Sequence, residues 1–414
     1  RYTCRDFGQN YLNSMDAKGN PVIFTNGDND TFPLWYNQET EGVRTDARVC
    51  NLSYLQTDWY IDQMRRPAYD SPSLPISWTR LQYVTGTREG IPVQPDALQQ
   101  VIDYYKDSPE DLKQMLGDNP YELKNIIRHW VLNDNPDLQI FPTDSIVVTV
   151  DKEAVKRSGM MIAADSIPDV MHISLKGKRA VYKSEMMMLE MISQANWERP
   201  LYMSTTVGPD NYGHLGDNFV QEGLACRITP FDTKQSGRTI DSERMYNNMM
   251  NKFKYGGLKE NPDIYLDETV IRMCYTHRRL FNQLAQQLLK EGQKDKALKV
   301  LQRAEEEIPG SIVPHEAFYG HSLELADAWL ALGHKAEAEK LLNAVGQNAK
   351  EYIEWYLSLN TQRLLQSSRE CLMQIYILND IAKTWEPIDK KKAETYRMEV
   401  NNYASRCHQR GMSL

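Results

Sequence analysis

Long hydrophobic runs are absent from this sequence. None of the 414 residues belongs to an uncharged apolar stretch of the roughly 18 residues that a membrane-spanning helix requires, and the mean hydropathy is -0.59. An excess of positive charge is also absent, because 48 lysines and arginines stand against 56 aspartates and glutamates and leave a net charge of -8. These absences exclude a helical membrane span within the chain and argue against nucleic acid as a partner.

Common catalytic and metal-binding signatures are missing as well. The sequence has no GxxxxGK phosphate loop, no GxGxxG dinucleotide loop, no HExxH zinc motif and no GxSxG nucleophile elbow. This argues against the commonest nucleotide-binding, zinc-protease and hydrolase sites. Cysteine is scarce, with six scattered residues and neither a CxxC pair nor a Cys/His spacing typical of zinc. We expect buried free thiols, although the even number would permit disulfides.

The chain is long enough for two or three domains, and its pattern changes near residue 260. Before that point, short β-rich runs alternate with helical patterns, which is typical of an α/β domain with a mostly parallel sheet. From Asp267 onward, helical periodicity dominates. We therefore predict an α/β domain at residues 1–260, with an irregular and helical insertion at 67–142, followed by an all-α domain at 261–414.

Two strand–helix units open the predicted α/β domain. An apolar run at 21–25 precedes a helical stretch at 32–39, and a strand candidate at 48–55 leads into a helical stretch at 58–66. The insertion contains many prolines and is expected to lie over the sheet as a lid. The helices predicted within the insertion are 95–116 and 120–132. After the insertion, we predict strands at 145–150, 170–175, 200–207 and 224–229. Further helices are predicted at 184–196 and 241–254.

The all-α domain carries an internal repeat. Small apolar residues, a turn at Gly292 and a terminating Pro309 fall at the offsets of a tetratricopeptide helical hairpin, and the pattern recurs around Gly333 at a longer spacing than the standard repeat. A third helical pair, at about 364–384 and 389–406, lacks the small residues and is expected to cap the array. The pattern predicts tetratricopeptide-like helical repeats.

The richest polar segment follows the first predicted strand, where ligands of α/β sheets usually bind. Its candidate ligand-binding residues are Asn26, Asp28, Asn29, Asp30 and Thr31. Asp28 and Asp30 are spaced so that both carboxylates could bind one divalent metal, Mg²⁺ or Mn²⁺, which could bridge a sugar nucleotide or sugar phosphate. The alternative is structural, with Asp30 or Thr31 capping the next helix and Asn26-Gly27 forming a turn.

A second polar loop, residues 208–218, follows the predicted strand at 200–207. If the strands are parallel neighbours, both loops open at one edge of the sheet. The candidates in this loop are Asp210, Asn211, Tyr212 and His214. His214 is a possible base or ligand, although an isolated loop histidine is more often only solvated. Asp58 and Trp59 would complete the rim; their alternative is a helix start with a buried tryptophan.

Longer motifs carry a resemblance to a known family. They include FTNGDNDTFPLWY at 24–36, EGVRTD at 41–46, TDWYIDQM at 57–64, NWERPLY at 196–202 and MYNNMMNKF at 245–253. In these motifs the chain closely resembles the soluble C-terminal part of a large Bacteroidetes family of multi-pass membrane proteins, long labelled as being of unknown function. Members of that family are similar to glycosyltransferases of the protein O-mannosyltransferase kind. They often have Trp-Gly where this chain has Tyr255-Gly256.

The resemblance implies a division of labour. The membrane half would carry the lipid-phosphate-sugar chemistry, and the half represented here would lie on the periplasmic side of the inner membrane. The sequence begins at Arg1 without a signal peptide, so we expect a processed product or a piece of a longer protein. Our leading hypothesis is a non-catalytic part of the enzyme that binds or positions an acceptor protein or peptide, with its own membrane half as the other partner.

Two other functions stay open at this point. In one, the chain is a self-contained, metal-dependent sugar-nucleotide transferase that uses Asp28 and Asp30. In the other, it is a structural scaffold whose repeats dock another component of the cell envelope. The acidic catalytic residue that the resemblance implies lies in a membrane loop of the family, and it has no counterpart in this chain.

Overall fold

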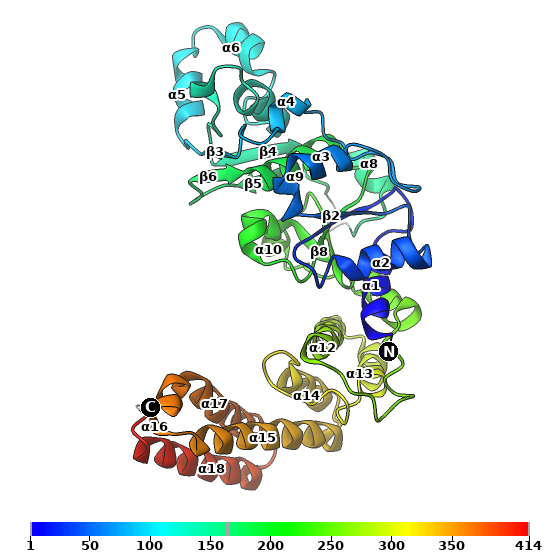
Figure 1. Ribbon diagram of the computed structural model, residues 1–414, viewed down its shortest axis with the longest axis vertical. Coiled ribbons are helices and arrows are strands. Elements are labelled where there is room, and N and C mark those ends of the chain that lie inside the picture. Colours follow the sequence, from blue (N-terminus) through cyan, green and yellow to red (C-terminus); the bar gives the residue numbers. More distant parts are fainter. Residues whose placement is uncertain (1, 162–165, 413–414) are drawn as a thin grey trace. The chain divides into compact units, whose positions relative to one another are not determined.

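The computed structural model describes residues 2–161 and 166–412, which fold into two compact units (Figure 1). The α/β unit comprises Arg5–Lys254, and the helical unit comprises Arg1–Cys4 together with Tyr255–Leu414. Among the described residues, every helix is too short or too polar to cross a lipid bilayer.

A five-stranded mixed sheet with the order β2-β1-β7-β9-β8 forms the centre of the α/β unit. β1 (Val22–Thr25) pairs in parallel with β2 (Arg48–Asn51) and with β7 (Leu201–Ser204). β9 (Ala225–Ile228) runs antiparallel to both β7 and β8 (Phe219–Gln221). The prediction of a mostly parallel sheet is therefore correct only for β2, β1 and β7. The connection between β8 and β9 is too short for the crossover that a parallel pair requires, so these two strands form a hairpin.

The parallel strands are buried along their whole length. All residues of β1, β2 and β7 are buried, including the polar Arg48 and Asn51 of β2, as expected for parallel strands covered on both faces. Met186, Met187 and Met188 of α9 (Lys183–Gln194) belong to the same apolar core. The remaining helices of this part are α1 (Thr3–Ser14), α2 (Phe32–Glu41), α3 (Asp58–Met64), α8 (Lys152–Arg157), α10 (Thr233–Ser236) and α11 (Ser242–Asn247).

Two antiparallel ribbons lie outside the central sheet. β4 (Ser145–Thr149) pairs with β5 (Val170–Ser174), and β3 (Gly90–Pro92) pairs with β6 (Ala180–Tyr182). The strands predicted at 145–150 and 170–175 are thus confirmed as strands, but they pair with each other instead of extending the central sheet. β3, β6 and β8 were not predicted, and each is only three residues long.

The segment predicted as an insertion contains four short α-helices, a π-helix (Ile127–Val131) and a 3-10 helix (Pro136–Leu138). Its Leu98, Leu116, Trp130 and Ile140 form a small apolar cluster. The single helix predicted at 95–116 is wrong, because the chain leaves the helix between Tyr105 and Ser108. Ser108 precedes Pro109, and proline disfavours helical backbone in the residue before it. The helices are α4 (Arg80–Tyr83), α5 (Ala97–Tyr104), α6 (Pro109–Leu116) and α7 (Leu123–Ile126).

The helical unit consists of helices, in agreement with the predicted all-α domain; most are joined by short turns, and an extended connection links α13 to α14. Gly292 and Gly333 adopt positive φ angles of 74° and 82° at the turns between α12 and α13 and between α14 and α15, where other residues would be strained. The helices are α12 (Glu268–Lys290), α13 (Lys294–Glu307), α14 (Ser322–Ala331), α15 (Lys335–Ser358), α16 (Thr361–Gln366), α17 (Ser368–Trp385) and α18 (Lys390–Gln409).

Candidate functional site

The loops that follow the three parallel strands meet at one edge of the sheet. The Asn26 side chain, directly after β1, donates a hydrogen bond from Nδ2 to Asn211 Oδ1 at 3.3 Å, and Asn211 lies in the loop after β7. Ser53, after β2, donates from its hydroxyl to Asn26 Oδ1 at 2.6 Å. Asn26 therefore joins all three loops, and we call this region the strand-end edge.

A buried carboxylate lies beneath this edge. Asp30 is 3% exposed, and its Oδ2 accepts hydrogen bonds from Thr206 Oγ1 at 2.8 Å, from Ser204 Oγ at 3.2 Å and from the main-chain N–H of Asn26 at 3.2 Å. Burial raises the pKa of Asp30, and the hydrogen bonds oppose this shift. Ser204 is the last residue of β7 and Thr206 lies two residues further on. Asp30 therefore attaches the loop after β1 to the end of the neighbouring strand.

Tyr11 of α1 completes the hydroxyl cluster around Asp30. Its hydroxyl lies 3.0 Å from both Ser204 Oγ and Thr206 Oγ1. Burial, reinforced by the nearby Asp30 carboxylate, raises the pKa of Tyr11 to about 12, so the phenol stays protonated. The sequence prediction missed Tyr11. The apolar spacing of Phe7, Tyr11, Leu12 and Met15, all buried, would have indicated the helix.

The alternative that Thr31 caps α2 is correct for its position but not for its side chain. Thr31 is the N-cap residue, but its side chain makes no capping hydrogen bond. Its Oγ1 instead lies 2.8 Å from Thr25 Oγ1 and accepts from Asn51 Nδ2 at 2.9 Å, which ties β1 to β2. The main-chain oxygen of Asp28 accepts the hydrogen bonds of the Thr31 and Phe32 amides at 3.2 and 2.9 Å. A main-chain turn therefore performs the capping.

The predicted metal pair receives no support from this arrangement. Asp28 and Asn29 are exposed, whereas the Asp30 carboxylate is buried among hydroxyl donors, so the two aspartates lie in different environments. Divalent Mg²⁺ and Mn²⁺ need several converging oxygen ligands. Within residues 2–161 and 166–412, no group of three or more His, Cys, Asp or Glu side chains is placed to hold a metal ion.

A row of aromatic rings borders the strand-end edge. Phe32 stacks on Trp35 with ring centroids 5.6 Å apart, and both belong to α2, which follows β1. Trp35 stacks on Tyr54 at 6.2 Å, and Tyr54 contacts Trp59 at 5.9 Å; these last two rings follow β2. Trp59 is 54% exposed and Phe32 is 44% exposed, so the expectation of a buried tryptophan at position 59 is wrong. We call these four residues the aromatic row.

Asp58, although adjacent to Trp59, has a structural task. Its carboxylate accepts a hydrogen bond from the Thr85 amide at 3.3 Å and lies 3.7 Å from the Arg80 guanidinium. The Thr85 amide is the main cause that lowers the pKa of Asp58, so the group is a carboxylate at neutral pH. Asp58 thereby holds α4 and the turn that follows it beside α3.

The other candidates in the loop after β7 lie in different surroundings. Asp210 is exposed and Asn211 contacts Asn26. Tyr212 is partly buried with its ring 4.8 Å from that of Phe219, and burial raises the pKa of its phenol. His214 does not join the strand-end edge cluster but lines a neighbouring cavity.

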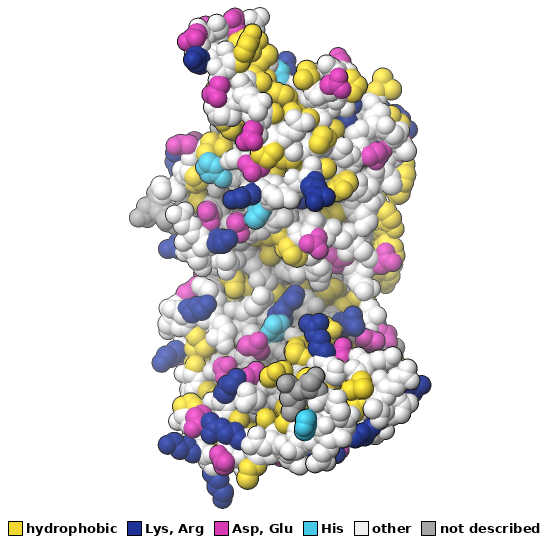
Figure 2. Space-filling view, turned by 90° about the vertical axis from the view of Figure 1, so that its left-hand side faces the viewer, with side chains coloured by type: hydrophobic (Ala, Val, Ile, Leu, Met, Phe, Trp, Pro, Cys, Tyr) yellow, Lys and Arg dark blue, Asp and Glu magenta, His cyan; other side chains and the backbone are white. Residues whose placement is uncertain are grey.

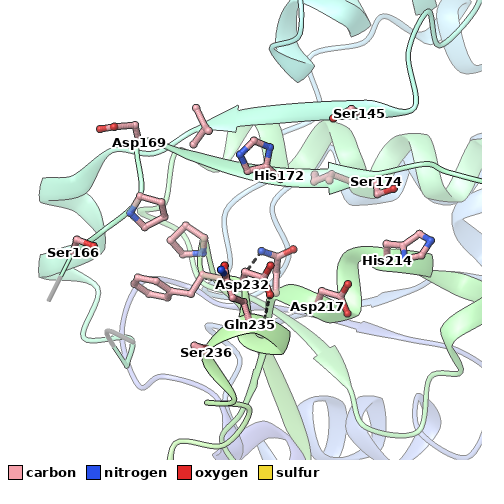
Figure 3. A pocket seen from close by; sticks show the side chains of 16 residues that line it. Ser145, Ser166, Asp169, His172, Ser174, His214, Asp217, Asp232, Gln235 and Ser236 are labelled. Carbon is pink, nitrogen blue, oxygen red and sulfur yellow. Dashed lines mark hydrogen bonds between the residues drawn. The ribbon is translucent and has the colours of Figure 1, made fainter. Parts of the chain in front are cut away.

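This cavity has a volume of about 710 Å³ and lies between the β4–β5 ribbon, the loop after β7 and α10 (Figure 3). His172 and Ser174 of β5 face it, together with Asp217, Asp232 and Gln235. The sequence prediction missed these residues. For His172 and Ser174 the available signal was the alternation along β5, where Met171 and Ile173 are buried and His172 is exposed.

Two of the acids around the cavity already have partners. Asp169 lies 2.6 Å from the Lys152 ammonium. Asp232 accepts a hydrogen bond from the main-chain N–H of Gln235 at 2.8 Å, at the start of α10. The cavity thus presents hydroxyl, imidazole, amide and carboxylate groups to solvent. On the face that Figure 2 draws, basic and acidic side chains of the described residues are also interspersed, without a patch of either sign.

The helical unit contains a cavity of its own, of about 580 Å³, lined by α12, α15, α17 and the segment before α14. Tyr275 and Tyr319 stack in it with ring centroids 6.5 Å apart, and Arg272 lies over the Tyr319 ring at 5.5 Å. The Arg272 charge is balanced by Glu268 at 2.6 Å. Other members of the lining are Phe318, Asn348, Tyr352 and Gln374. The lining is therefore rich in aromatic and amide groups.

The fold and the strand-end edge define a mixed α/β domain that presents polar and aromatic side chains where its parallel strands end. Residues 4–248 match the model of one protein family, TMEM260-associated domain 2. The match covers more than half of the chain, and the chain therefore belongs to this family, whose description refers to a membrane protein. Comparison with curated proteins found no match, and comparison with solved structures found none either.

Proposed function

We propose that this chain is the acceptor-binding part of a membrane protein glycosyltransferase and that it acts on the periplasmic side of the inner membrane. The family, whose description refers to a membrane protein, is consistent with this role, as is the resemblance of the long motifs. The observation that carries the proposal is the aromatic row, which lies beside the uncharged polar groups of the strand-end edge.

The chemistry of the edge suits binding better than bond breaking. Aromatic faces bind apolar side chains and the C–H faces of sugars, while amides and hydroxyls hydrogen-bond to a polypeptide backbone or to sugar hydroxyls. Asp30, the buried carboxylate below the edge, is engaged by three donors and serves the fold. A glycosyl acceptor, which offers both peptide and hydroxyl groups, matches these side chains.

The helical unit supplies a second binding surface on this proposal. We interpret it as a tetratricopeptide-like array, because glycine turns end the first helix of two successive hairpins and buried alanines let their helices pack closely. Such arrays use concave surfaces to bind polypeptides. The cavity with Tyr275, Tyr319 and the amides of Asn348 and Gln374 is the corresponding surface here.

A substitution in the aromatic row tests the proposal. In membranes that contain the full-length protein, Trp59→Ala should raise KM for the acceptor polypeptide about tenfold and leave kcat unchanged, because an exposed aromatic anchor contributes about 1–2 kcal/mol to binding. The measurement is the initial rate of sugar transfer from a lipid-linked donor at increasing acceptor concentration.

The matched control is Tyr104→Ala, which removes an exposed aromatic ring from the insertion and should change neither constant. An unchanged acceptor KM in Trp59→Ala would contradict the proposal. A loss confined to kcat would contradict it too, since a positioning surface that binds acceptor must affect its apparent affinity.

The self-contained metal-dependent transferase is less well supported, because the Asp30 carboxylate is buried among hydrogen-bond donors while Asp28 is exposed. The structural scaffold would leave the aromatic row without a task. We therefore place the sugar-transfer chemistry outside this chain.

A further inference from the structure

Two of the six cysteines are in contact. Cys371 Sγ and Cys407 Sγ lie 3.9 Å apart, and both side chains are fully buried. Both are free thiols in the structure. A disulfide bond is about 2.05 Å long, so the two sulfur atoms are separated by less than two bond lengths. Rotation of the side chains about their Cα–Cβ bonds is the movement needed to bring such neighbouring sulfur atoms together.

The two cysteines lie where the last two helices of the chain begin and end. Cys371 lies in the first turn of α17 and Cys407 in the last turn of α18, and these antiparallel helices are joined by a short turn after Trp385. The pair is therefore at the open end of the hairpin, far from that turn. The last hairpin of a helical array has a neighbour on one side only, so its ends are where fraying begins.

Existing contacts hold this open end from one side. Arg406 of α18 donates two hydrogen bonds to Glu354 of α15, at 2.5 and 2.7 Å. Arg410 donates to the main-chain oxygen of Leu357 at 2.6 Å. Both contacts join α18 to α15 and its C-terminal end, and neither joins α18 to the start of α17. A covalent bond between Cys371 and Cys407 would add a covalent connection between the start of α17 and the end of α18.

We propose that Cys371 and Cys407 form a disulfide bond that clamps the C-terminal hairpin. The two thiols lose their protons and two electrons to an oxidant that itself carries a disulfide, so that one S–S bond forms in the chain and the oxidant leaves as two thiols. Burial raises the pKa of both thiols, which makes them poor nucleophiles once packed. The bond therefore forms while the hairpin is folding. This inference is independent of the proposed function.

Peptide mapping tests the bond directly. The chain is unfolded, reduced, refolded with oxidised glutathione, blocked with an alkylating reagent and digested with trypsin. We expect peptide 370–383, which contains Cys371, to be linked to peptide 407–410, which contains Cys407. We also expect the oxidised chain to unfold at a higher urea concentration than the reduced chain, because the bond constrains the unfolded hairpin.

Cys371→Ala and Cys407→Ala should each abolish the linked peptide and the difference between oxidised and reduced chains. Cys50→Ala is the matched control, since Cys50 is equally buried but lies in the α/β unit, and this variant should retain both. Recovery of Cys371 and Cys407 as separate alkylated or glutathione-bound peptides would overturn the proposal. A linked chain that unfolds at the same urea concentration as the reduced chain would overturn the clamping role.

Discussion

Replacing Arg278 by methionine is expected to destabilise the helical unit by about 3 kcal/mol. The buried main-chain oxygens of Ile308 and Val313 would lose their donor, and each such loss costs about 1–3 kcal/mol, whereas the Pro314 oxygen keeps the Tyr275 hydroxyl as a donor. Arg278 is only 1% exposed and donates to three main-chain oxygens, those of Ile308, Val313 and Pro314, at 3.0, 2.8 and 2.9 Å. It thus joins α12 to the extended connection that follows α13. Methionine fills much of the same space but offers no donor.

Urea unfolding followed by circular dichroism measures this loss, with the transition of the helical unit fitted separately because a two-unit chain need not unfold in one step. Arg272→Met is the matched control, since the side chain of Arg272 is on the same helix but 59% exposed and pairs with Glu268. We expect the control to change stability by less than about 0.5 kcal/mol. Equal losses in both variants would show that Arg278 does not hold the connection.

Acid is expected to destabilise the helical unit through His277. Its side chain is 2% exposed, its ring lies 5.1 Å from that of Tyr255, and burial lowers its pKa to about 3. In the unfolded chain the same group titrates near pH 6.5. The folded pKa is depressed, so the contribution to stability is complete above pH 6.5 and is lost as the pH falls towards 3. Over that range the loss is on the order of 4 kcal/mol.

The slope of unfolding free energy against pH isolates this effect. His277→Gln carries no titrating group at this position and should lose much of the slope between pH 6.5 and pH 3. His408→Gln replaces an exposed histidine of the same unit and should retain the slope of the original chain. Identical slopes in all three proteins would rule out His277 as the cause.

The strands β1, β2 and β7 could be predicted from the sequence because short runs rich in β-forming residues, each followed by a polar loop, have few other interpretations. The pairing of β4 with β5 could not be predicted, since a run such as 145–150 shows that it is extended but not which strand it meets. α1 was missed although Phe7, Tyr11 and Leu12 have helical spacing. Its polar residues weakened that pattern, and the packing of Tyr11 against residues of β7 stabilises it.

The strand-end edge could be predicted in outline but not in its chemistry. Asn26 and Asn211 come together because their strands are parallel neighbours, which the strand–helix pattern already indicated. The role of Asp30 could not be predicted from the sequence, because its hydrogen-bond donors Ser204 and Thr206 are 174 and 176 residues away in the chain. The spacing of Asp28 and Asp30 indicated a metal-binding pair. The structure distinguishes the two residues, because Asp28 is exposed and Asp30 is buried.

On the proposed function, the most direct test of the central claim compares sugar transfer by the proposed membrane protein that contains this chain with sugar transfer by the chain alone. We predict transfer from a lipid-linked sugar to an acceptor polypeptide by the full-length protein. The isolated chain should transfer none, whether it is given the lipid-linked sugar or a nucleotide sugar with Mn²⁺, and should still bind the acceptor. Transfer by the isolated chain, especially transfer that Asp28→Asn abolishes, would contradict the account and favour a self-contained enzyme.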